Sequence, residues 1–273
     1  MAAVDAPTAA DQLVHLRDTF SCFAGSEREA RFIYKEIYDD HCYDVAELSD
    51  APFIIDVGAN IGLFSIYMRH KYPAARILAF EPAPQNYATL LKNLKLHDVA
   101  SGVETHACAL GSKEGREVLT YYPNAPGNST FTPDEKDRLR KKLPGDFYQK
   151  MLDRLVKDAS TVTVPVQRLS HFLDAYSDAD IPRIDLLKLD CESAELEVLR
   201  GVSEGHWPLI QNVVVEVSAI SGLLAELEAL LRLKGFKVIR EVAAWSPKES
   251  PMYMLQAVRV TARNGGSSVA IAG

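Results

Sequence analysis

Short apolar runs alternate with helix-like segments along most of this chain, and this rhythm limits its possible folds more than any other feature. The run Phe53–Val57 lies between Pro52 and Gly58 and is typical of a buried strand, and a helical pattern over 61–72 follows it. The same alternation predicts strands at 76–80, 103–108, 184–189, 213–217, 236–242 and 252–258, with helices at 84–96, 193–203 and 220–234. Strands that alternate with helices of roughly 10–15 residues are typical of βαβ units, so we predict an α/β fold with a parallel sheet. Only a loop joins the last two strands, which predicts an antiparallel strand at the edge of the sheet or inside it.

Charge and hydropathy argue against several classes of function. The 273 residues include 30 Lys and Arg against 37 Asp and Glu, a net charge of −7, whereas nucleic-acid-binding proteins present a basic face. A basic stretch at 136–142 is therefore interpreted as the solvated face of a helix. No stretch approaches the roughly 18 apolar residues of a membrane span, and the N-terminus lacks the basic start and apolar run of a signal peptide. We predict no nucleic-acid partner and no membrane association.

The cysteines and histidines do not predict a metal site. Cys22, Cys42, Cys108 and Cys191 match neither a CxxC pair nor a zinc pattern, which is typical of free thiols in a reducing cytosol. His171 and His206 are interpreted as ordinary polar positions. We therefore predict a cytoplasmic protein without a metal.

The chain divides into an extension, a main domain and a tail. Residues 1–47 are predicted to form an N-terminal extension that is largely helical over 10–47, because Ala30, Ile33, Tyr34, Ile37 and Tyr38 recur at helical spacing. The main domain is predicted over 48–260. Inside it, strands at 117–122 and 161–166 are expected to pair, and a polar helical segment at 133–159 separates them, broken at 144–145. We predict that this insertion, about 123–160, forms a cap, and that the Gly- and Ser-rich residues 261–273 form a flexible tail.

The loop Asp56–Gly62 joins the first strand of the sheet to its helix and carries the strongest local signal. Gly58 and Gly62 let the backbone turn tightly and approach a ligand without a Cβ clash. The helix start that follows offers N–H donors to a carboxylate or a phosphate. Glu81 ends the next strand, about 20 residues on, where a carboxylate can accept hydrogen bonds from ribose hydroxyls. Loop and acid together predict a cofactor that contains a nucleoside.

The loop favours one class of nucleoside cofactor. A dinucleotide site typically shows G-x-G-x-x-G, but here Asn60 replaces the middle glycine and would crowd a pyrophosphate. Asp56 would repel a phosphate but could accept a hydrogen bond from a ligand ammonium. S-adenosylmethionine has an ammonium, a carboxylate and a ribose, and no phosphate. The residues therefore favour methyl transfer over hydride transfer. A nicotinamide-dependent dehydrogenase ranks third, after a methyltransferase and a cofactor-binding module without turnover.

Five ordered motifs resemble those of the FkbM-type S-adenosylmethionine-dependent methyltransferases, over roughly residues 30–258. They are FIIDVGANIGLFS at 53–65, AFEPAPQNY at 79–87, ACALG at 107–111, PGNST at 126–130 and IDLLKLDCESAELEVLRG at 184–201. The last is similar to the family pattern K-x-D-x-E-G-x-E-x-x-V-L-x-G. It departs from that pattern at Ser193, where the family usually has Gly, and at Cys191, where Val is commoner.

The resemblance implies a class I methyltransferase fold, Rossmann-like, with seven strands, the last inserted antiparallel, and helices on both faces. It implies that the glycine loop borders the methionine and ribose, that Glu81 holds the ribose, and that residues 108–110 border the adenine. Asp190 would lie next to the sulfonium. Tyr43 is expected over the donor, and the turn at 126–129 is interpreted either as a loop tip or as a flap over the cofactor. The predicted cofactor-binding residues are Tyr43, Asp56, Gly58, Asn60, Gly62, Glu81, Pro82, Cys108, Ala109, Leu110, Asn128, Ser129 and Asp190.

Three carboxylates are candidates for a catalytic base. The methyl donor is already activated, so the protein mainly has to position the acceptor and exclude water. A hydroxyl acceptor also has to lose its proton, which a carboxylate can take. Asp190 and Glu192 follow the fourth parallel strand and Glu216 lies near the end of the next, at the edge where open α/β sheets bind ligands. We predict Asp190 or Glu192 as the base, with Glu216 third; the alternative is that Asp190 only contacts the cofactor.

We therefore predict O-methylation of a small-molecule or natural-product hydroxyl, such as that of a polyketide, peptide or sugar. The acceptor is either free or bound to a carrier protein. N-methylation stays open as a second reaction. A non-catalytic S-adenosylmethionine-binding module of a larger synthase is the alternative from another class of function.

Overall fold

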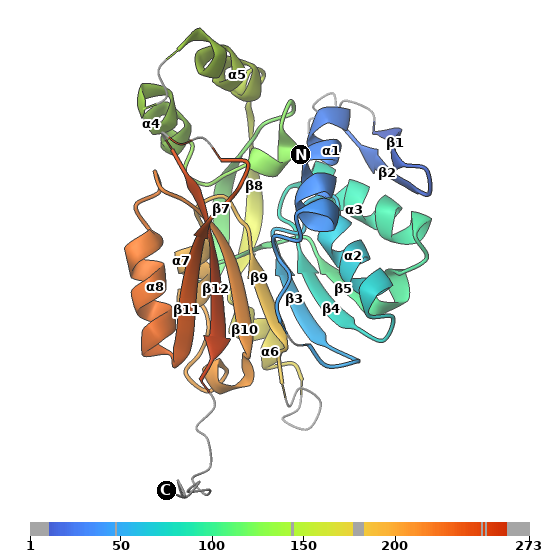
Figure 1. Cartoon of the computed structure of the whole chain (residues 1–273), viewed down its shortest axis with the longest axis vertical. Coiled ribbons are helices and arrows are strands. Elements are labelled where there is room, and N and C mark those ends of the chain that lie inside the picture. The colour runs from blue at the N-terminus through green and yellow to red at the C-terminus, as the bar shows by residue number, and fades with distance from the viewer. Residues whose placement is uncertain are drawn as a thin grey trace, which may run out of the picture.

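A seven-stranded sheet lies at the centre of the molecule, with the strand order β11–β12–β10–β9–β3–β4–β5 (Figure 1). The computed structural model describes residues 11–46, 48–142, 145–176, 183–246, 248 and 250–260. Strand β12 runs antiparallel to both of its neighbours, so the antiparallel strand lies inside the sheet. The α/β fold and the class I arrangement implied by the motifs are confirmed. The strands are β3 (Phe53–Val57), β4 (Arg76–Phe80), β5 (Val103–His106), β9 (Leu186–Leu189), β10 (Asn212–Ser218), β11 (Phe236–Val242) and β12 (Met252–Arg259).

Helices cover both faces of this sheet, because its central strands are apolar on both sides. In β3, Ile54 packs into the core under one set of helices and Ile55 into the core under the other. The first set is α1 (Glu27–Tyr34), α2 (Leu63–Lys71) and α3 (Pro84–Leu96). The second set is α6 (Leu169–Leu173), α7 (Glu195–Arg200) and α8 (Leu224–Leu233).

The strand order reverses between β3 and β9, and this fixes the place of the site. From β3 the chain continues outward to β4 and β5, and it later returns to β9, on the other side of β3, before β10. In open α/β sheets, ligands bind outside the carboxyl ends of the strands at such a switch point. Gly58, Glu81 and Asp190 directly follow β3, β4 and β9.

The N-terminal segment differs from its prediction. Residues 12–24 form a β-hairpin, β1 (Gln12–Arg17) and β2 (Phe20–Ala24), so the helix predicted from residue 10 is wrong for this part. Alternate residues of β2 are buried, and Asn93 of α3 binds the hairpin through both the N–H and the carbonyl of Phe23, at 2.7 and 3.0 Å. The helix begins only at Glu27, where Ser26 caps it, and continues as one π-helical turn, η1 (Lys35–Asp39).

Between β5 and β9 the chain forms a second, smaller sheet, and two helices lie within the predicted insertion. Strands β7 (Gly115–Tyr121) and β8 (Ser160–Gln167) pair antiparallel, as expected, and β6 (Ala109–Leu110) joins β8. Helices α4 (Asp134–Lys142) and α5 (Asp146–Val156) lie between them in sequence and project at the top of the view in Figure 1. Of the predicted break at 144–145, Gly145 directly precedes α5, and residue 144 lies outside the described residues. The predicted tail, 261–273, lies outside the described residues.

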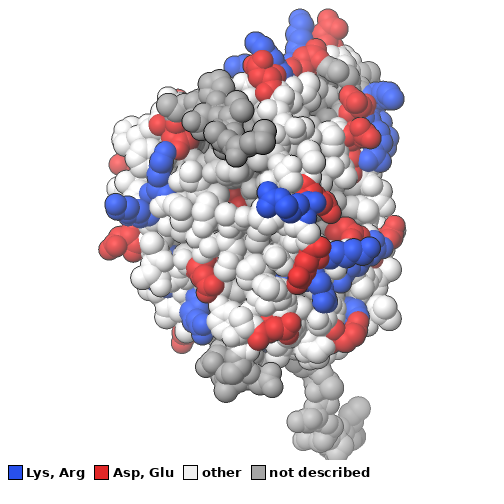
Figure 2. Space-filling model, turned by 180° about the vertical axis from the view of Figure 1, so that it is seen from behind, with Lys and Arg blue, Asp and Glu red and all other residues white. Residues whose placement is uncertain are grey.

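Charged side chains of both signs are mixed on the face shown in Figure 2. Among the helices that the structure describes, none has the length and apolar character needed to cross a bilayer.

Candidate functional site

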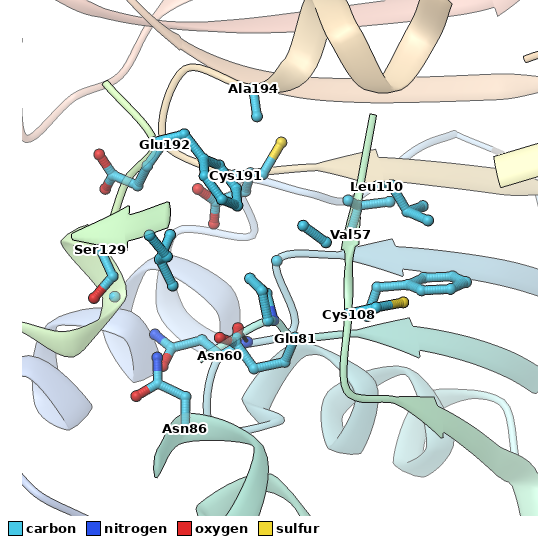
Figure 3. Close-up of a pocket in the computed structure, with 18 of the residues that line it drawn as sticks. Val57, Asn60, Glu81, Asn86, Cys108, Leu110, Ser129, Cys191, Glu192 and Ala194 are labelled. Atoms are coloured by element: carbon cyan, nitrogen blue, oxygen red, sulfur yellow. Dashed lines mark hydrogen bonds between the residues drawn. The ribbon is translucent and has the colours of Figure 1, made fainter. Parts of the chain in front are cut away.

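A pocket opens at the carboxyl ends of β3, β4 and β9, with about 600 Å³ of space including that open to solvent. In Figure 3, Asn60, Glu81 and Asn86 lie on one side of it, and Cys191 and Glu192 lie on the other. Of the predicted cofactor-binding residues, Gly58, Asn60, Glu81, Pro82, Cys108, Ala109, Leu110, Ser129 and Asp190 line this pocket. The other lining residues are Val57, Phe80, Asn86, Leu119, Pro126, Gly127, Phe131, Cys191, Glu192 and Ala194.

The glycine loop is shaped by its contact with the end of β9. Gly58 has φ +77°, and a Cβ on it would lie 1.8 Å from the backbone oxygen of Asp190. The N–H groups of Gly58 and Ala59 both donate to the carbonyl of Phe80, at 3.0 and 2.9 Å. Glycine is therefore required at position 58, because the loop joins three strand ends at close range. Gly62 (φ +89°) begins α2 and lies outside the pocket lining.

Two backbone N–H groups hold the carboxylate of Glu81 in place. Its two carboxyl oxygens accept hydrogen bonds from the N–H groups of Asn60 and Ala83, each at 2.8 Å. Burial raises the pKa of Glu81 to about 7, against the opposing effect of these two donors. Each carboxylate oxygen has further acceptor positions, so Glu81 can also accept two ribose hydroxyls.

Asp56 is placed differently from the prediction that it faces a ligand ammonium. It is fully buried below the loop, where it lies 3.1 Å from Lys188 Nζ and accepts a hydrogen bond from Ser65 at 2.7 Å. Lys188 also donates to the carbonyl of Gly58 at 2.8 Å. Burial alone would lower the pKa of Lys188, but the carboxylates of Asp56 and Asp190 outweigh it and raise the pKa. Asp56 thus anchors the loop through Lys188 and lies outside the pocket lining.

Tyr43 connects two of the three candidate bases. Its hydroxyl lies 2.9 Å from Asp190 Oδ2 and 3.0 Å from Glu216 Oε2, and its single hydrogen cannot serve both oxygens at once. Burial and the charges of Asp190, Glu36 and Glu192 raise the pKa of Glu216 well above its usual value. The raised pKa favours the protonated carboxyl at Glu216, which can donate the second hydrogen. It lies outside the pocket lining, whereas Asp190 lines the pocket.

The turn at 191–193 carries Glu192, the remaining candidate base. Its backbone conformation also explains why the family pattern has glycine at the position of Ser193. Glu192 and Ser193 have φ +52° and +79°, a region that glycine enters without strain. Glu195 holds the turn by accepting from the N–H groups of Cys191 and Ser193, both at 3.1 Å, and burial raises its pKa to about 7. Ser193 donates to Glu135 of α4, which ties the cap to the site.

The turn at 126–129 contributes to the pocket lining and is hydrogen-bonded to the N-terminal segment. It contains the short helix η3 (Pro126–Asn128), and Gly127 N–H donates to Glu29 of α1 at 2.7 Å. Ser129 lines the pocket, while Asn128 does not. The apolar end of the pocket is formed by Phe80 and the predicted adenine residues Cys108, Ala109 and Leu110. Burial raises the pKa of Cys108 to about 11, so its thiol stays neutral.

A second cavity, of about 360 Å³ including open space, lies beside the first and was missed from the sequence. Tyr43, predicted to lie over the donor, lines this one and is buried. Glu36 of η1 also lines it, and the prediction omitted Glu36. The available signal was its position on the apolar helix face between Ile33 and Ile37. The cavity shares Gly58, Asn60 and Asp190 with the first; its remaining lining is Ile33, Ile37, Ala59, Ile61, Leu63, Phe64 and Lys188.

Known proteins resemble this chain over most of its length. The family model described as methyltransferase FkbM domain matches residues 56–238. Methyltransferase sdnD of Sordaria araneosa is 50% identical over 240 residues, covering 86% of this chain and 93% of that protein. The 31-O-demethyl-FK506 methyltransferase FkbM of Streptomyces tacrolimicus is 39% identical over 223 residues, covering 78% and 84%. The crystal structure of a methyltransferase FkbM from Methylobacillus flagellatus has a TM-score of 0.48 at 18% identity, covering 78% of this chain and 45% of that one.

Proposed function

Because this chain belongs to the FkbM methyltransferase family, we propose that it transfers a methyl group from S-adenosylmethionine to a hydroxyl oxygen of a small molecule. One observation carries the proposal. A single pocket combines a carboxylate suited to ribose, an apolar end and two acidic side chains that follow β9. A nucleoside donor and a proton acceptor are thereby brought together.

The residues present fit this donor. Glu81 offers its remaining acceptor positions to the ribose hydroxyls, and Cys108, Ala109 and Leu110 offer an apolar border to the adenine. The side-chain oxygen of Asn60 is buried and lacks a hydrogen-bond partner among the described residues. An unsatisfied acceptor on the pocket wall fits a ligand that brings its own donors.

The chain's own chemical task is to orient the acceptor and to take its proton. Bound S-adenosylmethionine would supply an electrophilic methyl group. Asp190 and Glu192 line the pocket and are the two candidates for the base, and Lys188 Nζ lies 3.5 Å from Asp190 Oδ2. Glu216 contacts Tyr43 and lies outside the pocket lining, so we assign it no contact with the acceptor.

A relative's name supports oxygen as the accepting atom. The 39%-identical protein of Streptomyces tacrolimicus is named for methylating 31-O-demethyl-FK506. The acceptor class proposed here is a small-molecule hydroxyl, as in a polyketide, peptide or sugar, either free or bound to a carrier protein.

The first test is ligand binding followed by turnover. S-adenosylhomocysteine should raise the melting temperature, and NAD should not. A panel of hydroxylated glycosides, macrolides and peptides should yield a product heavier by one methyl group in place of hydrogen, with the methyl located on oxygen by NMR. Methylation on nitrogen would replace the proposed reaction. Binding without turnover across the panel would favour a non-catalytic module.

The second test identifies the base. Replacing it should lower kcat by about 10²- to 10⁴-fold, and S-adenosylhomocysteine affinity is measured alongside to separate loss of the base from weaker donor binding at Asp190. The variants are Asp190→Asn and Glu192→Gln, and Glu204→Gln, an exposed glutamate paired with Lys234, is the control. An unchanged kcat in both variants would contradict a base among these residues.

A further inference from the structure

Glu36 is a buried acid that the proposed function has not used. Its side chain is 6% exposed, and its Oε1 has no hydrogen-bond partner in the described part of the chain. The carboxyl lines the second cavity together with Tyr43, Lys188 and Asp190. Leaving such a group unsatisfied costs free energy, so a missing partner from a ligand is the physical expectation.

The partner that suits this site best is a hydrogen-bond donor with positive charge. Besides Glu36 Oε1, the buried Oδ1 of Asn60 on the same cavity wall lacks a partner among the described residues. The one ammonium lining the cavity, that of Lys188, already contacts Asp56 at 3.1 Å and the carbonyl of Gly58 at 2.8 Å. Acceptors thus outnumber donors here, and a ligand ammonium would correct both the charge and the hydrogen bonding.

The start of helix α2 at this cavity suits a carboxylate. Gly62, which has no side chain to cap the helix, precedes Leu63 and Phe64, and these two residues line the cavity. The Gly62 N–H donates to the carbonyl of Ala59 at 2.8 Å, and the hydrogen bond from Ile66 N–H to the carbonyl of Gly62 begins the helical series, so the N–H groups of residues 63–65 are the ones that a helix start leaves without a partner in a preceding turn. An ammonium site and a helix start facing one cavity match a zwitterionic amino-acid group.

The geometry points to Glu36 as the counter-charge for the α-ammonium of the methyl donor, whose amino-acid end occupies the second cavity. This inference rests on the proposed function. Asp56, the acid expected in this role, is already paired with Lys188 below the loop. Glu36 is a positioning residue supplied by a π-helical turn, a rare element that is frequent at functional sites.

Two ligands that differ only at the amino-acid end test this assignment. S-adenosylhomocysteine carries that end, and 5′-methylthioadenosine keeps the nucleoside and lacks it. Their affinities are measured by calorimetry on the full chain and on Glu36→Gln, which keeps the shape and removes the charge. The variant should bind S-adenosylhomocysteine about ten- to hundredfold more weakly, as expected for a lost hydrogen bond between charged groups, and should bind methylthioadenosine within twofold of the parent.

The control is Asp39→Asn, which removes a carboxylate from the same turn outside the cavity and should change neither affinity. An equal loss for both ligands in Glu36→Gln, or no loss for either, would overturn the role of Glu36 and leave the proposed function standing. If the parent protein binds neither ligand, the proposed function itself fails. The amine analogue of S-adenosylhomocysteine that lacks the carboxylate should keep its sensitivity to Glu36→Gln, and insensitivity would contradict the assignment.

Discussion

The two walls of the site are built in different ways. The sheet-edge wall consists of Gly58, Glu81 and Asp190 at the ends of β3, β4 and β9, and the N-terminal wall consists of Glu36 and Tyr43. On the sheet-edge wall, two backbone N–H groups of the protein itself donate to the carboxylate of Glu81. On the N-terminal wall, Glu36 Oε1 lacks a partner among the described residues. The first wall is therefore a rigid frame, and the second is completed by what binds there.

The largest loss of unfolding free energy is expected from a substitution at Gly58 of the sheet-edge wall. In Gly58→Ala, the added Cβ would meet the backbone oxygen of Asp190 at 1.8 Å and would require a non-glycine residue at φ +77°. Overpacking against backbone and left-handed strain together should cost about 4–6 kcal/mol of unfolding free energy. Urea unfolding followed by circular dichroism measures this. Gly25→Ala, where a Cβ meets nothing within 4 Å, is the matched control, and equal stability of the two variants would show that the frame tolerates movement.

A slightly smaller loss of unfolding free energy is expected from breaking the ion pair between Lys188 and Asp56. Lys188→Met leaves Asp56 buried with its Oδ1 deprived of the ammonium at 3.1 Å, which should cost about 3–5 kcal/mol. The double variant with Asp56→Asn removes both charges and should recover much of that loss. Denaturant midpoints of the two single variants and the double variant form a cycle. Strict additivity of the two single losses would show that this pair does not act as a unit.

The sequence predicted the frame well because its signals are local. The apolar run of β3, the glycines after it and Glu81 after β4 all lie within one βαβ unit. The partner of Asp56 could not be predicted in the same way, because Lys188 comes from β9, far along the chain, and only the parallel pairing of β3 with β9 brings the two together. Asp56 and Lys188 each lie in one of the family motifs, but the motifs do not show that the two charges pair with each other.

The N-terminal wall was predicted poorly because tertiary contacts decide its structure. The helical spacing that holds from Glu27 was extended back to residue 10, where contacts with Asn93 favour a hairpin instead. No local motif marks Glu36, which in the sequence is one acidic residue within a predicted helix. Its position gains meaning only when η1 lies beside α2 and Asp190.

The N-terminal wall should make donor binding depend on pH. Burial and the charges of Asp190 and Asp40 raise the pKa of Glu36 to about 8, so below pH 8 the free site is mostly protonated there. An ammonium requires the carboxylate, so affinity should rise from pH 6 to pH 8, by up to about tenfold per unit. Burial likewise raises the pKa of Glu81 to about 7, but the ribose that it binds is common to both test ligands. The groups facing Glu36 are Lys35, Asp40, Cys42, Tyr43, Lys188, Asp190 and Glu216.

The measurement is therefore the ratio of affinities for S-adenosylhomocysteine and methylthioadenosine across this pH range. The ratio should rise with pH in the parent protein and stay flat in Glu36→Gln, whereas the shared effect of Glu81 cancels. A ratio that rises equally in both proteins would assign the titration to another group. If the sheet-edge wall binds the common nucleoside as proposed, its variants should shift both affinities together.

The smallest effect is expected where the cap meets the frame, at Ser193. Its φ of +79° strains any residue other than glycine, while its hydroxyl donates to Glu135 of α4. Ser193→Ala loses the hydrogen bond and keeps the strain, whereas Ser193→Gly loses the bond and removes the strain. The glycine variant should therefore be more stable than the alanine variant by about 0.5–1 kcal/mol, after the greater chain entropy of glycine is subtracted. The control is Ala88, an exposed residue inside α3, where alanine should be more stable than glycine. Ala88→Gly should lose about 1 kcal/mol of unfolding free energy. Thermal unfolding of these variants compares the two positions, and an alanine variant at 193 as stable as the glycine variant would mean that this turn relaxes out of the left-handed region.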